Sequence, residues 1–171
     1  MEAKELTIRQ TPCGSSLPDA EVPMINTLVA CLGVQHRKLN DLDMHLVYGA
    51  TRLVSESGSI EGNQKVLQTW DEIRQELWGH LQIEDGLVSW GVGHHALSST
   101  LIDTLKGERR EMRRLMAVLR ASSPNKREAR AVGDQSSFAE TLLALALMLD
   151  THVERYEREV FPSIRRALFP K

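Results

Sequence analysis

Apolar residues recur every three, four or seven positions along most of the chain, the period of an α-helix that buries one face. The first run extends from about residue 23 to 55, with Ile25, Leu28, Leu32, Leu39, Leu42, Leu46 and Leu53. A second run follows the polar break at 55–63, with Val66, Leu67, Trp70, Ile73, Leu77, Leu81, Leu87 and Val88. The pattern predicts two amphipathic helices in the first half of the chain.

Two further runs occupy the second half. Gly91 and Gly93 interrupt the pattern, after which a third stripe contains Leu97, Leu101, Leu105, Met112, Leu115 and Leu119. A polar loop over 122–134 leads to Ser137-Phe-Ala-Glu140, whose Ser-x-x-Glu form predicts the start of a fourth helix by a capping box. That helix should kink or restart at Pro162, because proline removes a backbone donor and clashes with the preceding turn.

Long amphipathic helices with short connections pack most simply as an all-α, up-down-up-down four-helix bundle. The chain has 171 residues, 42% of them hydrophobic, enough to bury a core, and 5% aromatic, with few β-branched runs that would favour a sheet. Turn formers are dense in residues 1–22, which predicts an irregular N-terminal arm. We therefore expect this arm followed by one bundle domain over 23–171.

Charge and composition exclude several classes of function. The formal net charge of −2 gives no global reason to expect nucleic acid or an anionic membrane as a partner. The longest apolar run, 142–149, is too short to span a bilayer, and the acidic N-terminus differs from a signal peptide. Cys13 and Cys31 are expected to be reduced thiols. These features predict a cytoplasmic protein.

The common catalytic motifs are also missing from the sequence. There is no glycine-rich phosphate loop after a strand, no Gly-x-Ser-x-Gly turn and no Cys-x-x-Cys pair. The charged segment 106–130 interleaves arginines with Glu108 and Glu111, which is typical of a solvated helix face with intrahelical pairs. The remaining candidates for chemistry are the histidines.

Six histidines are distributed so that each predicted helix has at least one: His36, His45, His80, His94, His95 and His152. A lone histidine on an apolar face is more often a hydrogen-bonded core residue than a ligand. A set that spans all the helices beside carboxylates is, however, how a bundle builds a metal site. The strongest local signal is His80 and Glu84, four residues and about 40° apart around a helix, so that both can reach one metal.

The other histidines leave alternatives open. His152 is followed by Tyr156 at the fourth position and Glu157 at the fifth, and either could supply an oxygen ligand. His94 lies in line with the third apolar stripe and ranks above His95, which is rotated by about one residue. His45 lies about 180° round a straight helix from His36, so we expect it to be exposed or structural.

The order and spacing of these motifs resemble the hemerythrin family, the HHE cation-binding domain proteins, over about residues 24–165. The matching segments are 35–39, 80–85, 94–97 and 152–162. The resemblance implies a non-haem di-iron centre held by histidines and two bridging carboxylates in a four-helix bundle. Carried over residue by residue, the implied ligands are His36, His80, Glu84, His94, His152 and Glu157, with Tyr156 and His95 as alternatives.

Two functional hypotheses follow. The first is a hemerythrin-like di-iron protein that binds or reacts with O₂, peroxide or nitric oxide; as an enzyme it would be an oxidoreductase consuming peroxide or nitric oxide with an electron donor. The second is a metal-poor bundle acting as an interaction or regulatory module. It is favoured by two departures from the family pattern: Tyr156 stands where many relatives have a carboxylate, and Trp90 where oxygen carriers have a histidine. Imidazole and carboxylate ligands suit iron, and zinc or manganese could also bind.

Overall fold

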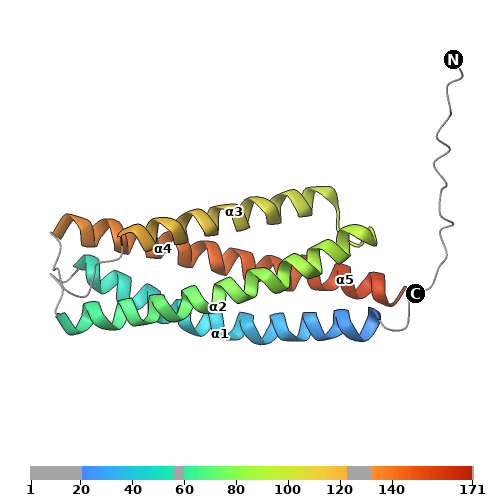
Figure 1. Cartoon of the computed structure of the whole chain (residues 1–171), viewed down its shortest axis with the longest axis horizontal. Coiled ribbons are helices and arrows are strands. Elements are labelled where there is room, and N and C mark those ends of the chain that lie inside the picture. Colours follow the sequence, from blue (N-terminus) through green and yellow to red (C-terminus); the bar gives the residue numbers. More distant parts are fainter. Residues whose placement is uncertain (1–20, 56–59, 123–131, 171) are drawn as a thin grey trace, which may run out of the picture.

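The computed structural model describes residues 21–55, 60–122 and 132–170, and Figure 1 shows them as an elongated bundle in which successive long helices run in opposite directions. The elements are α1 (Glu21–Ser55), α2 (Ile60–Gly93), α3 (Ser99–Ser122), α4 (Val132–Arg155), the π-helical segment η1 (Tyr156–Val160) and α5 (Phe161–Leu168). The predicted all-α, up-down-up-down bundle is confirmed. In the described part of the chain, no helix combines the length and apolar character needed to cross a bilayer.

Two helices begin earlier than the sequence pattern predicts. α2 begins at Ile60 and α4 at Val132. Ser137, predicted as the N-cap of the last long helix, lies inside α4, where its carbonyl accepts a hydrogen bond from Thr141 Oγ1 at 2.8 Å. That prediction is wrong because Ser137 and Glu140 lie on the exposed face of α4, where a helix interior also tolerates polar residues. The irregular arm was predicted over 1–22, but residues 21 and 22 belong to α1. Residues 1–20, 56–59 and 123–131 lie outside the described residues.

The core consists of two hydrophobic clusters separated along the bundle axis. One contains Leu39 to Ala50 of α1 and Met112 to Leu119 of α3, and the other contains Ile25 to Leu32 of α1 and Leu101 to Leu105 of α3. At the boundary every long helix contributes buried polar side chains. We give the name polar layer to these side chains together with the partly buried Glu108: His36, His80, Glu84, Glu108, Arg109 and His152.

The restart predicted at Pro162 is confirmed, and it takes the form of a π turn. The backbone N–H of Phe161 donates to the carbonyl of Tyr156, five residues back, and α5 then begins with Pro162 in its first turn. Proline has no N–H to donate to a preceding carbonyl, so the chain widens by one residue before the helix resumes. The wider turn leaves Tyr156, Val160 and Phe161 all buried in the second cluster.

Candidate metal centre

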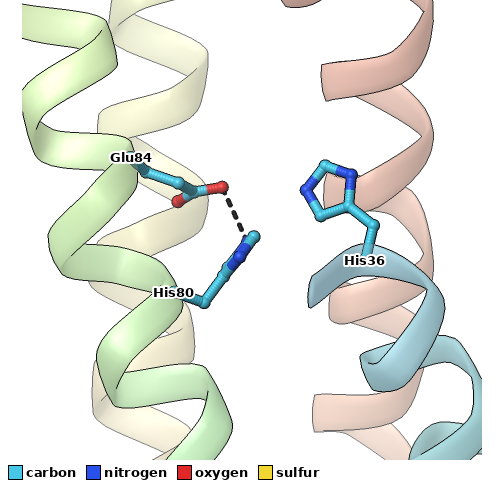
Figure 2. Close-up of side chains that lie close together, drawn as sticks. All are labelled: His36, His80 and Glu84. Atoms are coloured by element: carbon cyan, nitrogen blue, oxygen red, sulfur yellow. Dashed lines mark ion pairs between the residues drawn. The ribbon is translucent and has the colours of Figure 1, made fainter. Parts of the chain in front are cut away.

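Three buried side chains from α1 and α2 converge in the middle of the bundle. Each of His36, His80 and Glu84 offers a ligand atom, and these atoms all lie within 4.8 Å of one another. Figure 2 shows the three side chains pointing into the space between α1 and α2. His80 and Glu84 are one helical turn apart, and His80 Nε2 lies 2.9 Å from Glu84 Oε1. The structure thus brings together three of the residues that the sequence singles out.

Polar atoms of this group are buried without partners. In the described part of the chain, the buried side-chain atoms that lack a hydrogen bond include His36 Nε2, His80 Nε2, Glu84 Oε2 and Tyr156 OH. The 2.9 Å approach of His80 to Glu84 is an ion-pair distance without the alignment of a hydrogen bond. Each unsatisfied buried polar group costs about 1–3 kcal/mol. Four of them at one place indicate a site built to be completed by a ligand such as a metal ion.

The two histidines of this group are oriented by acceptors at their other ring nitrogen. His36 Nδ1 lies 3.0 Å from Glu157 Oε1, and His80 Nδ1 lies 3.3 Å from Gln35 Oε1. A carboxylate or amide oxygen accepts, so Nδ1–H is the donor in both rings. Burial lowers the pKa of His36, which favours the neutral ring. His36 therefore presents an unprotonated Nε2 to the centre, and both rings are held by an acceptor at Nδ1, as in metal-ligating histidines.

His152 lies on the opposite side of Glu84 and has carboxylates at both nitrogens. Its Nε2 lies 2.8 Å from Glu84 Oε1, and its Nδ1 lies 2.9 Å from Glu108 Oε2. Burial lowers the pKa of His152, but the two carboxylates outweigh burial and raise it to about 9. Burial raises the pKa of Glu84, and the neighbouring His152 and His80 lower it to about 2. At neutral pH His152 is therefore an imidazolium, and Glu84 beside it is an ionised carboxylate.

Tyr156 and Glu157, the alternatives on the last helix, occupy different environments. The Tyr156 ring is buried 5.0 Å from the His152 ring and 5.8 Å from the His36 ring. Burial, followed by the charge of Glu84, raises the pKa of Tyr156, so the free side chain stays a phenol. The Glu157 side chain is 51% exposed and contacts His36 from outside. Tyr156 therefore faces the centre, whereas Glu157 contacts the solvent-side nitrogen of His36, a candidate ligand.

The family assignment rests on a match over most of the chain. The family described as Hemerythrin HHE cation binding domain matches residues 25–164. The chain belongs to this family. No curated protein and no solved structure matches the chain. The family is one of cation-binding domains, and the His36, His80 and Glu84 group supplies imidazole and carboxylate donors that could hold a metal ion.

In this hemerythrin-family bundle, His94 and His95 lie outside the three-residue group. α2 extends through Gly93, and the chain reverses with Ala96 N–H donating to Gly91 O at 2.8 Å and His95 N–H to Val92 O at 3.2 Å. This is a Schellman motif, with His95 at a φ of 52° in the left-handed position. The expectation that His94 continues the apolar stripe of the third helix is wrong, because α3 starts only at Ser99.

The contacts of these end-of-bundle histidines are local. His94 Nε2 lies 3.2 Å from Glu21 Oε2, and its ring stacks on Trp90 with centroids 4.5 Å apart. His45, expected to be exposed, is exposed, and its Nδ1–H donates to the carbonyl of Asp41 at 2.8 Å. The structure therefore places these side chains away from the centre.

Sequence reasoning missed Glu108 and Arg109 of α3, which it assigned to a solvated face. The Arg114 and Glu111 pair three residues apart is intrahelical as expected. Arg109, in contrast, is buried and pairs with Asp85 of α2, while Glu108 contacts His152 and Arg155 of the last long helix. The signal was present, because Glu108 lies three residues after Leu105 and four before Met112, on the apolar stripe.

Proposed function

We propose that this chain binds iron between α1 and α2 and that the iron centre binds or reacts with O₂, peroxide or nitric oxide. The observation that carries the proposal is the set of unpartnered buried atoms at His36, His80, Glu84 and Tyr156. Two imidazole nitrogens and a carboxylate form a donor set that suits non-haem iron. Membership of a cation-binding family supports the same conclusion.

The residues of the centre would have distinct roles. His36 and His80 would bind the metal through Nε2, and Glu157 and Gln35 orient the two rings at the opposite nitrogen. Glu84 supplies a negative charge that stabilises a bound cation, and its burial keeps water from screening that charge. Bound iron would supply a Lewis-acidic position and electrons for a small ligand.

The number of ions and the oxygen donor of the last helix are finer points of the proposal. The family resemblance implies two irons with bridging carboxylates, in which His152 and Glu157 would also be ligands. Tyr156 competes with Glu157 for the role of oxygen donor, and its buried hydroxyl without a hydrogen-bond partner favours Tyr156. Metal analysis and spectroscopy of variants distinguish these arrangements.

The functional test is to load the purified protein anaerobically with ferrous iron and to add O₂, hydrogen peroxide or nitric oxide separately. We expect the visible spectrum to change with at least one of the three, in proportion to the bound iron. A matched His36→Leu variant should bind little iron and show no change, because it lacks a candidate ligand. Wild-type protein that folds but takes up no iron would contradict the proposal and favour the metal-poor interaction module.

A further inference from the structure

The helix α3 contributes none of the three converging side chains, but it contacts α2 and α4 beside the centre. In the described part of the chain, the group that could hold a metal ion comes from α1 and α2. Glu108 of α3 contacts His152 of α4, and the next residue, Arg109, pairs with Asp85 of α2. Asp85 directly follows the candidate ligand Glu84. Two adjacent residues of α3 are thus connected to both sides of the polar layer.

Asp85 is bound by arginines at both of its carboxylate oxygens. Its Oδ1 accepts a hydrogen bond from Nη1 of the buried Arg109, and its Oδ2 accepts one from Nη2 of Arg113 at 3.3 Å. The two arginines are one helical turn apart on α3, so both reach the same carboxylate. α2 packs much less extensively against α3 than against α1. The Asp85 contacts therefore form a directional, charge-assisted link where α2 and α3 are otherwise loosely packed.

Stability alone does not explain why Arg109 is buried. A guanidinium group loses its hydration on burial, and replacing a buried ion pair with apolar side chains of similar volume is often neutral or stabilising. Arg109 lies four residues after Leu105 and three before Met112, both fully buried, so an apolar side chain would fit the same stripe of α3. An ion pair, in contrast to apolar packing, is directional. The pair with Asp85 is therefore better explained by the alignment of α2 with α3.

We propose that Arg109 is a positioning residue for the metal centre: through Asp85 it fixes the rotation of α2, and with it the directions in which Glu84 and His80 point. This inference rests on the proposed iron-binding function and adds two residues to it. Consecutive residues are about 100° apart around a helix, so holding Asp85 against α3 holds Glu84 toward the interior of the bundle. His80 lies one turn before Glu84 on the same face and turns with it. Contacts beyond the ligands orient metal-binding side chains in this way.

The test is a double substitution that removes the ion pair without leaving a buried charge. In Asp85→Ala combined with Arg109→Met, we expect the metal-free protein to melt at a temperature no lower than that of the wild type, because no unpaired guanidinium is buried. We expect the same variant to bind ferrous iron about 10–100-fold more weakly, measured in competition with a chelator. At matched iron content, the Mössbauer lines of the iron-57 protein should broaden, because Glu84 is oriented less uniformly.

Two further variants serve as rescue and control. Arg109→Lys keeps a cation that can pair with Asp85, so we expect it to recover most of the iron affinity and the narrow lines. Arg114→Met combined with Glu111→Ala removes an exposed pair within α3 that does not contact α2, and it should match the wild type in both measurements.

The outcomes separate this inference from the proposed function. If the double variant of Asp85 and Arg109 bound iron as tightly as the wild type with an unchanged spectrum, the inference would be wrong and the proposed function would stand. A much lower melting temperature with an unchanged spectrum would assign the pair a purely structural role, with the same consequence. Wild-type protein that folds but binds no iron would overturn both.

Discussion

The two halves of the polar layer both contain histidine and glutamate, and they differ in the partners of these side chains. Between α3 and α4, His152, Glu108 and Arg155 form a continuous set of contacts at 2.7 to 2.9 Å. Between α1 and α2, His36 and His80 direct nitrogens without hydrogen-bond partners toward Glu84. The polar groups of α3 and α4 have partners, some of them on α2, whereas His36 Nε2 and Glu84 Oε2 lack hydrogen bonds and are available to a ligand.

This difference shows that buried histidines are not equivalent as candidate ligands. A histidine with carboxylates at both nitrogens is stabilised as a cation, whereas a histidine with one outer acceptor keeps a lone pair for a metal. His152 contacts a carboxylate at each nitrogen, whereas His36 contacts one at Nδ1 and has no hydrogen-bond partner at Nε2. The second carboxylate at His152 comes from α3, because Glu108 of that helix contacts His152 Nδ1.

The largest expected effect comes from removing a candidate ligand on α1 or α2. His36→Leu, His80→Leu and Glu84→Ala should each lower iron affinity by more than about 100-fold, because each removes one of three donors. Iron content after anaerobic loading and desalting measures this loss. His94→Ala is the matched control and should keep iron, because His94 contacts Glu21 at the end of the bundle. If His94→Ala and His36→Leu lost equal amounts of iron, the prediction that iron binds at the centre and not at the end of the bundle would be wrong.

The second effect is spectroscopic and concerns Tyr156. If its phenolate binds ferric iron, the oxidised protein should have a visible charge-transfer band that disappears in Tyr156→Phe, because phenylalanine has no oxygen donor. We expect that band, since the Tyr156 hydroxyl is buried at the centre without a hydrogen-bond partner. Absorption spectra at matched iron content provide the measurement. An unchanged spectrum in Tyr156→Phe together with loss of iron in Glu157→Ala would assign the oxygen donor to Glu157.

A smaller effect should follow from weakening the outer contacts of the candidate ligands. Gln35→Ala removes the acceptor at His80 Nδ1, and Glu157→Gln weakens the acceptor at His36 Nδ1. Such outer partners typically contribute about 10–100-fold to metal affinity, and the half-exposed Glu157 should lie at the low end. Iron titration in competition with a chelator measures the change. Affinities equal to the wild type in both variants would show that these contacts do not orient the rings.

The smallest effect concerns pH and lies outside the centre. Burial, followed by the charge of Asp150, raises the pKa of Asp43 to about 6. Ionisation is easier in the unfolded chain, so stability should fall as pH rises from about 4 to 6. Asp43→Asn removes this penalty and should be more stable at pH 7 by about 1 kcal/mol, a value reduced for the partial exposure of Asp43. Thermal melts of both proteins at pH 7 and pH 4 test the prediction.

The effect of Asp43→Asn should depend on pH. At pH 4 the two proteins should have nearly equal stability, because Asp43 is then largely protonated in the folded protein. A gain that is the same at pH 4 and pH 7 would show that the substitution acts through packing and not through charge. Asp150→Asn, which removes only the neighbouring charge, should give a smaller gain at pH 7.

Much of the fold and part of the centre could be predicted from sequence. The apolar period predicts the helices and their inward faces, and the spacing of His80 and Glu84 places both on one face. Gly91 misled the prediction of where the second helix ends. A Cβ at Gly91 would lie 2.8 Å from Leu97 Cγ, so this glycine allows the reversing chain to pack closely against α2 and does not end the helix.

The partners of the buried groups could not be predicted, because they depend on which helices face each other across the bundle. Glu108 is on the apolar stripe of its helix, but only the packing of α3 against α4 shows that it contacts His152. Likewise Tyr156 and Glu157 are adjacent in sequence but differ in exposure. In the π turn that follows Arg155, Tyr156 is buried and Glu157 is half-exposed. Helical spacing in sequence specifies faces but not contacts between helices.

The most direct test of the central claim is an anomalous difference map, recorded at the iron absorption edge, from crystals of the iron-loaded protein. The account predicts a peak between His36, His80 and Glu84, within coordination distance of their ligand atoms. Iron-loaded crystals with no peak at these three residues, or with a peak only elsewhere in the chain, would contradict it.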